Sequence, residues 1–308
     1  MVIRRGDESC RMADSGSVVA IGNFDGLHLG HQAIVGRLLL RGREERLPAA
    51  VLTFEPHPRE YFAPVAAPAR LMRLRDKAEM LAALGVDELR VLRFGAGISR
   101  WDGATFIERV LVGAMGAKRI VIGEGFRFGR GREGDITLLR SLGMTHGFDV
   151  EEMAPVEVGG QRASSTRVRE ALAGGRLDEA RALLGHDYRM SGRVVSGAQL
   201  GRRLGFPTAN IRLHRRVSPL AGIFAVRVSG PSLMRHPGVA SVGTRPAVGG
   251  SEWLLEVHLF DVDRNLYRQR LWVDFIARIR DEIAYDDLGA MTAQMHRDCA
   301  RARELLDA

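Results

Sequence analysis

The sequence predicts an α/β domain with a doubly wound parallel sheet, followed by a small antiparallel β-barrel with a terminal helix. Up to about residue 155, short apolar segments alternate with helical patterns, which is typical of βαβ units. After about residue 186 the apolar period changes from helical to alternating, and short strands separated by turns favour a barrel. The predicted domains are therefore 1–186 and 187–308.

Short apolar or β-branched runs give the predicted strands of the first domain: 17–24, 49–54, 89–92, 119–124 and 149–153. Helical patterns lie between them, for example over 77–84 and 106–112. In the second domain the predicted strands are 189–196, 222–229, 236–243, 252–260 and 265–275, and a helix covers about 287–305. Ligands of doubly wound sheets bind at the carboxyl ends of the strands. Three such ends carry glycine, proline or polar segments, so we expect them to converge on one crevice: 22–31, 53–58 and 123–129.

Composition excludes several classes of protein. A chain of 308 residues with 45% hydrophobic content is long enough for two cores. The formal charge of +8 comes without a polybasic tract or an aromatic-basic motif, so we expect anionic small molecules and no nucleic acid as partners. Cys10 and Cys299 lie at opposite ends and predict no disulfide or thiolate cluster. No stretch is long enough for a membrane span and the first residues are too polar for a secretory signal, so a cytoplasmic protein is expected. The sequence leaves open whether it forms a homo-oligomer.

A glycine-framed segment with two histidines follows the first predicted strand: Gly22-Asn23-Phe24-Asp25-Gly26-Leu27-His28-Leu29-Gly30-His31. A strand that ends in glycines and opens a helix leaves backbone N–H groups pointing at one spot, which suits a phosphate. An isolated His-x-x-His is more often two surface histidines on a turn. Because the glycines, the strand and the spacing coincide, the segment indicates nucleotidyl-transfer chemistry.

This segment resembles the first signature of the HxGH-type nucleotidyltransferases, and its Asn-Phe-Asp-Gly start narrows the likeness to the bacterial bifunctional riboflavin kinase/FAD synthetases. The resemblance implies that the first domain transfers AMP from ATP to FMN, giving FAD and pyrophosphate. A phosphate monoester is already anionic and needs no protein base, so His28 and His31 would act as electrostatic clamps and positioners. The nucleotide-binding residues implied here are Gly22, Asn23, Phe24, Asp25, Gly26 and Gly30.

A second segment, Ser164-Ser165-Thr166-Arg167-Val168-Arg169, opens a predicted helix. By itself it is a common helix start, in which Ser or Thr caps the first turn. Together with the first signature it resembles the Ser-Ser-Thr-x-x-Arg element that holds the β- and γ-phosphates of ATP in this superfamily. The match implies that Ser165 and Thr166 donate N–H and hydroxyl groups and that Arg169 supplies a guanidinium fork. Arg167 is expected to be structural or auxiliary.

The flavin ring needs an apolar slot with flat walls. Phe62 and Phe128, with Pro56 and Pro58, are the candidates, and ordinary core packing is an equal alternative for each aromatic. The resembling family usually carries Asn or Asp where this chain has Gly125. That departure places the efficiency of the adenylyl step in question.

The strongest signal of the second half is the segment from Gly192 to Asn210, which ends in Phe206-Pro207-Thr208-Ala209-Asn210. This ending resembles the Pro-Thr-Ala-Asn motif of riboflavin kinases, which implies that Thr208 and Asn210 hold Mg²⁺ and the phosphates of ATP. Few hard oxygen ligands, completed by water and phosphate, are what Mg²⁺ accepts. The glycines let the backbone fold close to a phosphate. The nucleotide-binding residues implied here are Gly192, Gly197, Gly201, Gly205 and Pro207.

Phosphorylation of the riboflavin 5′-hydroxyl also needs a group that accepts its proton, for which a strand carboxylate is suitable. Glu256 matches the base of the family, because the Val-His-Leu-Phe-Asp that follows it matches as well. Glu252 lies on the same strand face and is the competitor, with a solvated strand surface as its ordinary reading.

The resemblance covers roughly residues 17–305 and predicts a bifunctional enzyme with ATP, riboflavin and FMN as substrates and Mg²⁺ as cofactor. One alternative is an active kinase joined to a weak adenylyltransferase, which Gly125 suggests. Another is a non-catalytic flavin- or RNA-binding regulator. The combination of a base, metal ligands and both histidines argues against that regulator.

Overall fold

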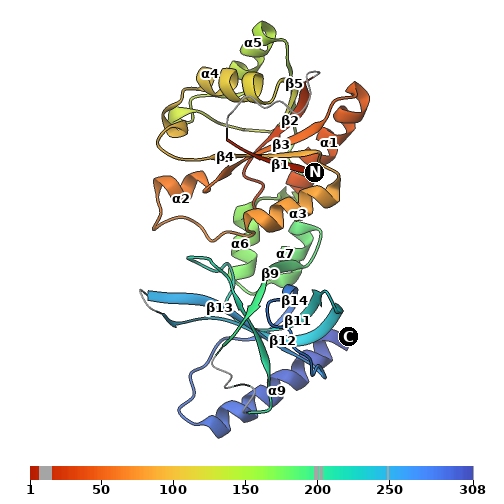
Figure 1. The fold of residues 1–308 in the computed structure, drawn as a ribbon, viewed down its shortest axis with the longest axis vertical. Coiled ribbons are helices and arrows are strands. Elements are labelled where there is room, and N and C mark those ends of the chain that lie inside the picture. The colour runs from red at the N-terminus through yellow and green to blue at the C-terminus, as the bar shows by residue number, and fades with distance from the viewer. Residues whose placement is uncertain (7–15, 198–200, 202–203, 248–249, 308) are drawn as a thin grey trace. The chain divides into compact units, whose positions relative to one another are not determined.

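The computed structural model describes the chain except residues 7–15, 198–200, 202–203, 248–249 and 308. Cys10 and part of the predicted glycine-rich kinase segment therefore lie outside the described residues. The chain divides into two compact units, each described by itself below (Figure 1). The first unit comprises Met1–Pro68 and Arg73–Ser164, and the second comprises Ala69–Met72 and Ser165–Ala308.

The first unit contains a six-stranded sheet in the order β1-β4-β3-β2-β5-β6, with every pair parallel. This confirms the predicted α/β fold. Its central strands are largely buried, and β2 is buried at all five residues, because helices cover both faces of such sheets. The strands are β1 (Val2–Arg5), β2 (Ser17–Ile21), β3 (Ala49–Glu55), β4 (Glu88–Arg93), β5 (Ala117–Gly123) and β6 (Asp149–Met153).

Helices connect these parallel strands, as Figure 1 shows. Helix α1 (Leu29–Glu45) packs against β2, β3 and β5, and α5 (Ile136–His146) packs against β6. The remaining elements are α2 (Pro58–Phe62), α3 (Leu74–Leu84), η1 (Ile98–Arg100), α4 (Gly103–Phe106), the π-helical η2 (Ile107–Ala114), η3 (Arg130–Arg132) and the small hairpin of β7 (Glu157–Val158) and β8 (Gln161–Arg162).

The sheet order places the predicted strand ends together. Strands β3, β2 and β5 are neighbours in the sheet, and because they are parallel their carboxyl ends lie at the same edge. The histidine signature follows β2, and the loop that contains Gly125 follows β5. The predicted segment 53–58 covers the end of β3 and the residues after it. The three strand ends therefore share one edge of the sheet, and the crevice expected between them stays a prediction.

The second unit contains a closed barrel in the order β10-β13-β12-β11-β14-β9, with antiparallel neighbours. Helix α9 (Leu288–Asp307) packs against β11, β12 and β14, so the predicted terminal helix is confirmed. The strands are β9 (Tyr188–Val195), β10 (Thr208–Arg212), β11 (Gly222–Gly230), β12 (Leu233–Ala247), β13 (Gly250–Leu259) and β14 (Arg270–Arg280).

Strand positions differ from the sequence predictions in several places. Strands β1, β7, β8 and β10 are not among the predicted strands. The last predicted strand, 265–275, begins later, at Arg270. The reason is a turn, in which Arg268 has a left-handed φ of 65° and Gln269 N–H donates to the Leu266 carbonyl at 3.1 Å.

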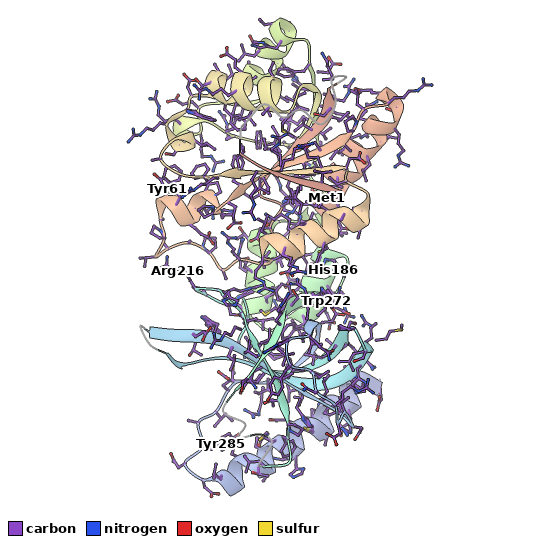
Figure 2. The ribbon with its side chains drawn as sticks, in the orientation of Figure 1. Met1, Tyr61, His186, Arg216, Trp272 and Tyr285 are labelled. Carbon is purple, nitrogen blue, oxygen red and sulfur yellow. The ribbon has the colours of Figure 1, made fainter. Side chains whose placement is uncertain are left out.

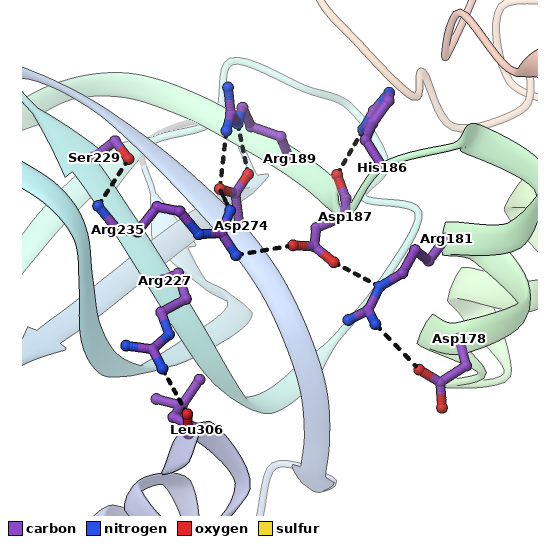
Figure 3. Close-up of polar contacts among 10 residues, drawn as sticks. All are labelled: Asp178, Arg181, His186, Asp187, Arg189, Arg227, Ser229, Arg235, Asp274 and Leu306. Carbon is purple, nitrogen blue, oxygen red and sulfur yellow. Dashed lines mark hydrogen bonds and ion pairs between the residues drawn. The ribbon is translucent and has the colours of Figure 1, made fainter. Parts of the chain in front are cut away.

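Helices α6 (Ser165–Ala173) and α7 (Leu177–Leu184) belong to the same compact unit as the barrel. A chain of arginine–aspartate ion pairs links α7 to strands β9, β12 and β14 (Figure 3). Arg181 bonds Asp187 at 2.7 Å, and Arg235 bridges Asp187 and Asp274 at 3.3 and 3.2 Å. Arg189 contacts the same Asp274 at 2.5 Å. The continuous part of the second compact unit thus begins at Ser165, before the predicted boundary near residue 186.

Candidate active sites

The first signature forms the connection from β2 to α1. Phe24 and Leu27 adopt left-handed backbone conformations, with φ of 48° and 42°, while their side chains are fully buried. Non-glycine residues rarely hold such conformations unless packing enforces them. The two buried side chains therefore fix the course of the loop, and α1 begins directly after His28.

The two histidines of the signature lie against each other. Their rings stack with centroids 3.7 Å apart and an angle of 28° between the planes. His28 is buried at the N-cap position of α1, and His31 lies in the first turn. The structure therefore brings the two predicted imidazoles together at the N-terminus of a helix, where an anion is favoured.

His31 is held neutral at pH 7. Burial lowers the pKa of this imidazole well below its ordinary value, and the positive charges of His28 and Lys77 lower it further. Its Nδ1 is buried and has no hydrogen-bond partner within the described part of the chain. A neutral imidazole keeps one N–H donor. His31 can therefore donate a hydrogen bond as a neutral imidazole.

The positive charge near the loop comes from a residue that the sequence analysis did not single out. Lys77 of α3 is only 6% exposed, and its Nζ donates to the Asn23 carbonyl at 2.5 Å and to Thr53 Oγ1 at 3.2 Å. A signal was present in the sequence, because Lys77 is one of just two lysines in an arginine-rich chain and faces the core side of a predicted helix.

The flavin-slot candidates have unlike environments. Phe128 is buried in the core of the first unit, where its ring lies 5.5 Å from Phe106 and 5.6 Å from Phe126. Phe62 is 66% exposed on α2, next to Tyr61, which Figure 2 labels. Pro58 is the first residue of α2. Pro56 lies just before it, in the connection from β3 to α2. Phe128 is therefore packed in the core, as the alternative interpretation expects, whereas the ring of Phe62 is exposed.

Gly125 lies on an exposed turn after β5. Its φ is +73°, and a Cβ built there would meet no atom within 4 Å. The backbone conformation is the left-handed one that glycine and asparagine tolerate best. Space is therefore available for the side chain that the resembling family carries at this position.

The second nucleotide signature begins α6, as predicted. Ser165 and Thr166 lie in the first turn, where helix N–H groups are available. Arg169 Nε donates to the Ala69 carbonyl at 2.6 Å, and Arg167 pairs with Glu179 at 3.7 Å. The ion pair agrees with the structural role expected for Arg167.

In the barrel, strand register places the predicted kinase residues on one face. Asn210 of β10 is the direct cross-strand partner of Glu256 on β13, and Thr208 is the partner of His258. Directly opposed residues point to the same side of a sheet. The residues between them, Ala209 and Val257, are buried and line the opposite face. Thr208, Asn210 and Glu256 therefore share the outer face of the barrel wall.

The donors on this face fit a hard cation. Asn210 is 5% exposed, and its Oδ1 has no hydrogen-bond partner among the described residues. Its Nδ2 lies 3.5 Å from Thr208 Oγ1, which places a hydroxyl oxygen next to the amide. The described residues contain no cluster of three or more His, Cys, Asp or Glu side chains. Few neutral oxygens completed by phosphate and water are the setting that suits Mg²⁺.

Two of the predicted glycines lie against these donors. A Cβ on Gly197 would come within 2.6 Å of the Asn210 carboxamide, and one on Gly201 within 2.4 Å of the Phe206 carbonyl. Gly192 instead makes room for Ile211, and Gly205 takes a left-handed φ of +85°. Pro207 directly precedes β10, and its carbonyl lies 3.0 Å from Nδ1 of His258. Any larger residue at Gly197 would displace the Asn210 amide.

Glu252 has a different environment from Glu256. It pairs with Arg212 at 3.7 Å, and both side chains are partly exposed. This geometry fits the solvated strand surface that the sequence analysis gave as its ordinary reading.

Comparison with known proteins covers both units. The family model for FAD synthetase matches residues 10–167, and the model for riboflavin kinase matches residues 184–306. A bifunctional riboflavin kinase/FMN adenylyltransferase of Escherichia coli K12 is 47% identical over 289 residues, covering 94% of this chain and 92% of the relative. The Haemophilus influenzae protein of that name is 44% identical, covering 98% of each chain.

One solved structure supports the fold. A chain described as a macrolide-efflux protein from Streptococcus pneumoniae matches with a TM-score of 0.81 and 29% identity, over 97% of each chain. Within the described residues, none of the helices has the length and apolar character needed to cross a bilayer. The two family models and the extended identity to curated relatives agree. The chain therefore belongs to the bifunctional riboflavin kinase/FMN adenylyltransferases, the family that phosphorylates riboflavin and adenylylates the FMN it forms.

Proposed function

We propose that the barrel phosphorylates riboflavin and that the parallel-sheet domain, predicted as 1–186, adenylylates FMN, with the predicted site residues in the roles below. The observation that carries the kinase half is the shared face of Thr208, Asn210 and Glu256, with a buried Asn210 oxygen that has no partner among the described residues. A buried acceptor without a hydrogen bond costs about 1–3 kcal/mol, so it supports a ligand at this point.

In the kinase reaction, the γ-phosphate of ATP is transferred to the 5′-oxygen of riboflavin, which loses its proton. Glu256 accepts that proton as the general base. Thr208 and Asn210 hold Mg²⁺, which when bound neutralises charge on the phosphates. Gly197 and Gly201 leave space for the backbone to lie close to the Asn210 amide and to Phe206.

In the adenylyl reaction, a phosphate oxygen of FMN attacks the α-phosphorus of ATP and pyrophosphate leaves. The nucleophile is already anionic, so the protein positions it and stabilises the charge that develops. His28 and His31 donate hydrogen bonds to phosphate oxygens from the start of α1. On the motif match, Ser165, Thr166 and Arg169 bind the β- and γ-phosphates. Phe62 offers an apolar face for the flavin ring.

The remaining partners are proposed from the sequence. The anionic substrates account for the basic charge without a nucleic acid partner, and the working location is the cytoplasm. A weak adenylyl step beside an active kinase is the second candidate, which the glycine at position 125 favours.

One incubation tests the proposal. Purified protein is mixed with riboflavin and ATP, with and without Mg²⁺, and FMN and FAD are separated by chromatography. We expect both products, and neither when Mg²⁺ is chelated. FMN without FAD would instead support the second candidate, and flavin binding without either product would indicate a regulator.

A further inference from the structure

Lys77 is a buried amine close to the histidine signature. It projects from α3 and is 6% exposed. Burying an ammonium is costly unless hydrogen bonds compensate, and lysine is almost never fully buried without a partner. The position therefore needs an explanation beyond the helix itself.

The ammonium connects two separate strand ends. Nζ donates to the carbonyl of Asn23, in the signature loop after β2, and to the hydroxyl of Thr53, near the end of β3. The Thr53 hydroxyl also donates to the Asn23 carbonyl, at 3.3 Å. Three groups that are far apart in the sequence thus meet behind the signature loop, and the Asn23 and Thr53 oxygens that accept from Lys77 are neutral.

The charge of Lys77 also acts on the histidines. After burial and the charge of His28, the ammonium of Lys77 is the third cause that lowers the pKa of His31. His28 faces His31 from the N-cap and Lys77 faces it from α3, while Asp25 is the buried carboxylate of the same loop. The His31 imidazole stays neutral, and the Lys77 ammonium is a fixed positive charge that acts on it.

We propose that Lys77 is a positioning residue for adenylyl transfer, which fixes the signature loop through the Asn23 carbonyl and supplies the positive charge that faces the substrate phosphates. The proposal rests on the function proposed for the first unit. In it, His31 acts as a neutral donor, and the charge of Lys77 lies behind the loop, where solvent does not screen it.

Lysine suits this position better than arginine. An ammonium is compact and places its charge at one point, whereas a guanidinium carries five N–H donors in a rigid plane. The Asn23 carbonyl and the Thr53 hydroxyl each present a single oxygen, which a compact ammonium reaches without placing a wide planar group in the core. Most basic residues of this chain are arginines, so the lysine at this buried point agrees with a requirement for the smaller group.

Three variants of the full-length protein test the proposal. Lys77→Met removes the charge and the donors, and Lys77→Gln removes the charge but keeps a donor for the Asn23 carbonyl. Lys118→Met, at an exposed lysine of β5 in the same sheet, is the matched control. We measure FAD formation from supplied FMN and ATP, FMN formation from riboflavin, and the NMR titration of the His31 ring.

Both Lys77 variants should reduce the kcat of FAD formation about tenfold to a hundredfold, less than the roughly 10²–10³ lost with a donor that touches the transition state, because Lys77 acts from behind the loop. FMN formation should not change, and Lys118→Met should match the natural chain. The His31 ring should titrate at higher pH in both Lys77 variants. Protonation of His31 then restores part of the lost charge, so the rate of each variant relative to the natural chain should rise as the pH falls through the range in which the His31 ring titrates in that variant.

Three outcomes would overturn the proposal. The first is a His31 titration that is unchanged in a folded Lys77 variant. The second is a relative rate that does not depend on pH, because a merely structural role would lower the rate equally at every pH. The third is unfolding of the first unit in both variants, which would make Lys77 a core residue only. If His28→Ala and His31→Ala leave FAD formation intact, the proposed role of the histidines fails separately, and the His31 titration still reports on Lys77.

Discussion

The first unit gathers its site from three strand ends of a parallel sheet, whereas the barrel takes its site from two neighbouring antiparallel strands. In the sheet, Asn23, Thr53 and Lys77 come from different βαβ units and meet only because β2 and β3 are neighbours. In the barrel, Asn210 and Glu256 are opposite each other in one ladder. One site therefore depends on the order of strands, and the other on the register of a single pair.

The chemistry of the two sites differs in the same way. Nucleotidyl transfer to FMN starts from an anion and needs fixed donors and charge, which strand ends and a helix N-terminus provide. Phosphorylation of a hydroxyl also needs a base, and the strand register places Glu256, the proposed base, opposite Asn210, a proposed cation ligand. The two reactions should thus be separable by single substitutions, and the predictions below test that separation.

The largest effect is expected at Glu256, the proposed general base of the kinase reaction. Glu256→Gln keeps the size of the side chain but removes the basic carboxylate, so kinase turnover should fall by about 10²–10⁴. FAD formation from supplied FMN should persist. The measurement is the rate of FMN production from riboflavin at saturating ATP and Mg²⁺.

Glu252→Gln is the matched control for this prediction. Glu252 takes part in a partly exposed ion pair with Arg212, which contributes no more than about 1 kcal/mol. Kinase turnover should change little. If Glu252→Gln is the damaging change and Glu256→Gln is not, the base must be reassigned.

The converse separation is expected in the first unit. Replacing His28 and His31 with Ala should lower FAD formation by about a hundredfold, because each loss removes a donor to the transition state. FMN formation should be almost unchanged. His146→Ala, at the end of α5, is a control for loss of a histidine from the same unit. Equal loss of both reactions would indicate misfolding or a shared site.

The contrast between the units also explains how far the sequence predicts the structure. The strands of the parallel sheet are visible as apolar runs because both of their faces are buried, as in β2, where all five residues are buried. Strand β1 is not visible, because it is an edge strand whose residues are largely exposed. Strand β10 is not visible in the sequence either, because it is only five residues long and its polar residues, Thr208 and Asn210, belong to the Pro-Thr-Ala-Asn motif.

The site residues also differ in how well the sequence reveals them. Side chains within one motif, such as His28 and His31, are identified by spacing because a single helix turn brings them together. Lys77 lies 54 residues from the carbonyl it bonds, so no local pattern reports that contact. The neutrality of His31 likewise depends on burial and on Lys77, neither of which spacing shows.

A smaller effect is expected from dividing the chain. The fragments 165–308 and 187–308 should both make FMN, because β10 and β13 are present in each. The shorter fragment lacks α7, with its buried Leu177, Leu183 and Leu184 and the ion pair from Arg181 to Asp187. Loss of that burial should lower the free energy of unfolding by a few kcal/mol, measured by urea denaturation.

Equal stability of the two fragments would show that α6 and α7 add nothing to the barrel, contrary to the compact unit described here. A folded 187–308 fragment that makes no FMN would overturn the assignment of the kinase to this part of the chain.

The smallest effect is expected at Gly125, where the sheet unit departs from the resembling family. Gly125→Asn should raise the rate of FAD formation or leave it unchanged, because asparagine tolerates the φ of +73° and meets no atom there. Gly85→Asn is the matched control, because Gly85 also has a left-handed φ of +98° and open space around it but lies at the end of α3.

Gly125→Val should give a lower rate of FAD formation than either asparagine variant, because a β-branched residue strains this backbone conformation. The rates of FAD formation from FMN are compared at equal thermal stability. A marked drop for Gly125→Asn alone would mean that the loop needs the bare glycine backbone, so that the departure at Gly125 is structural and the adenylyl site works without a side chain at this point.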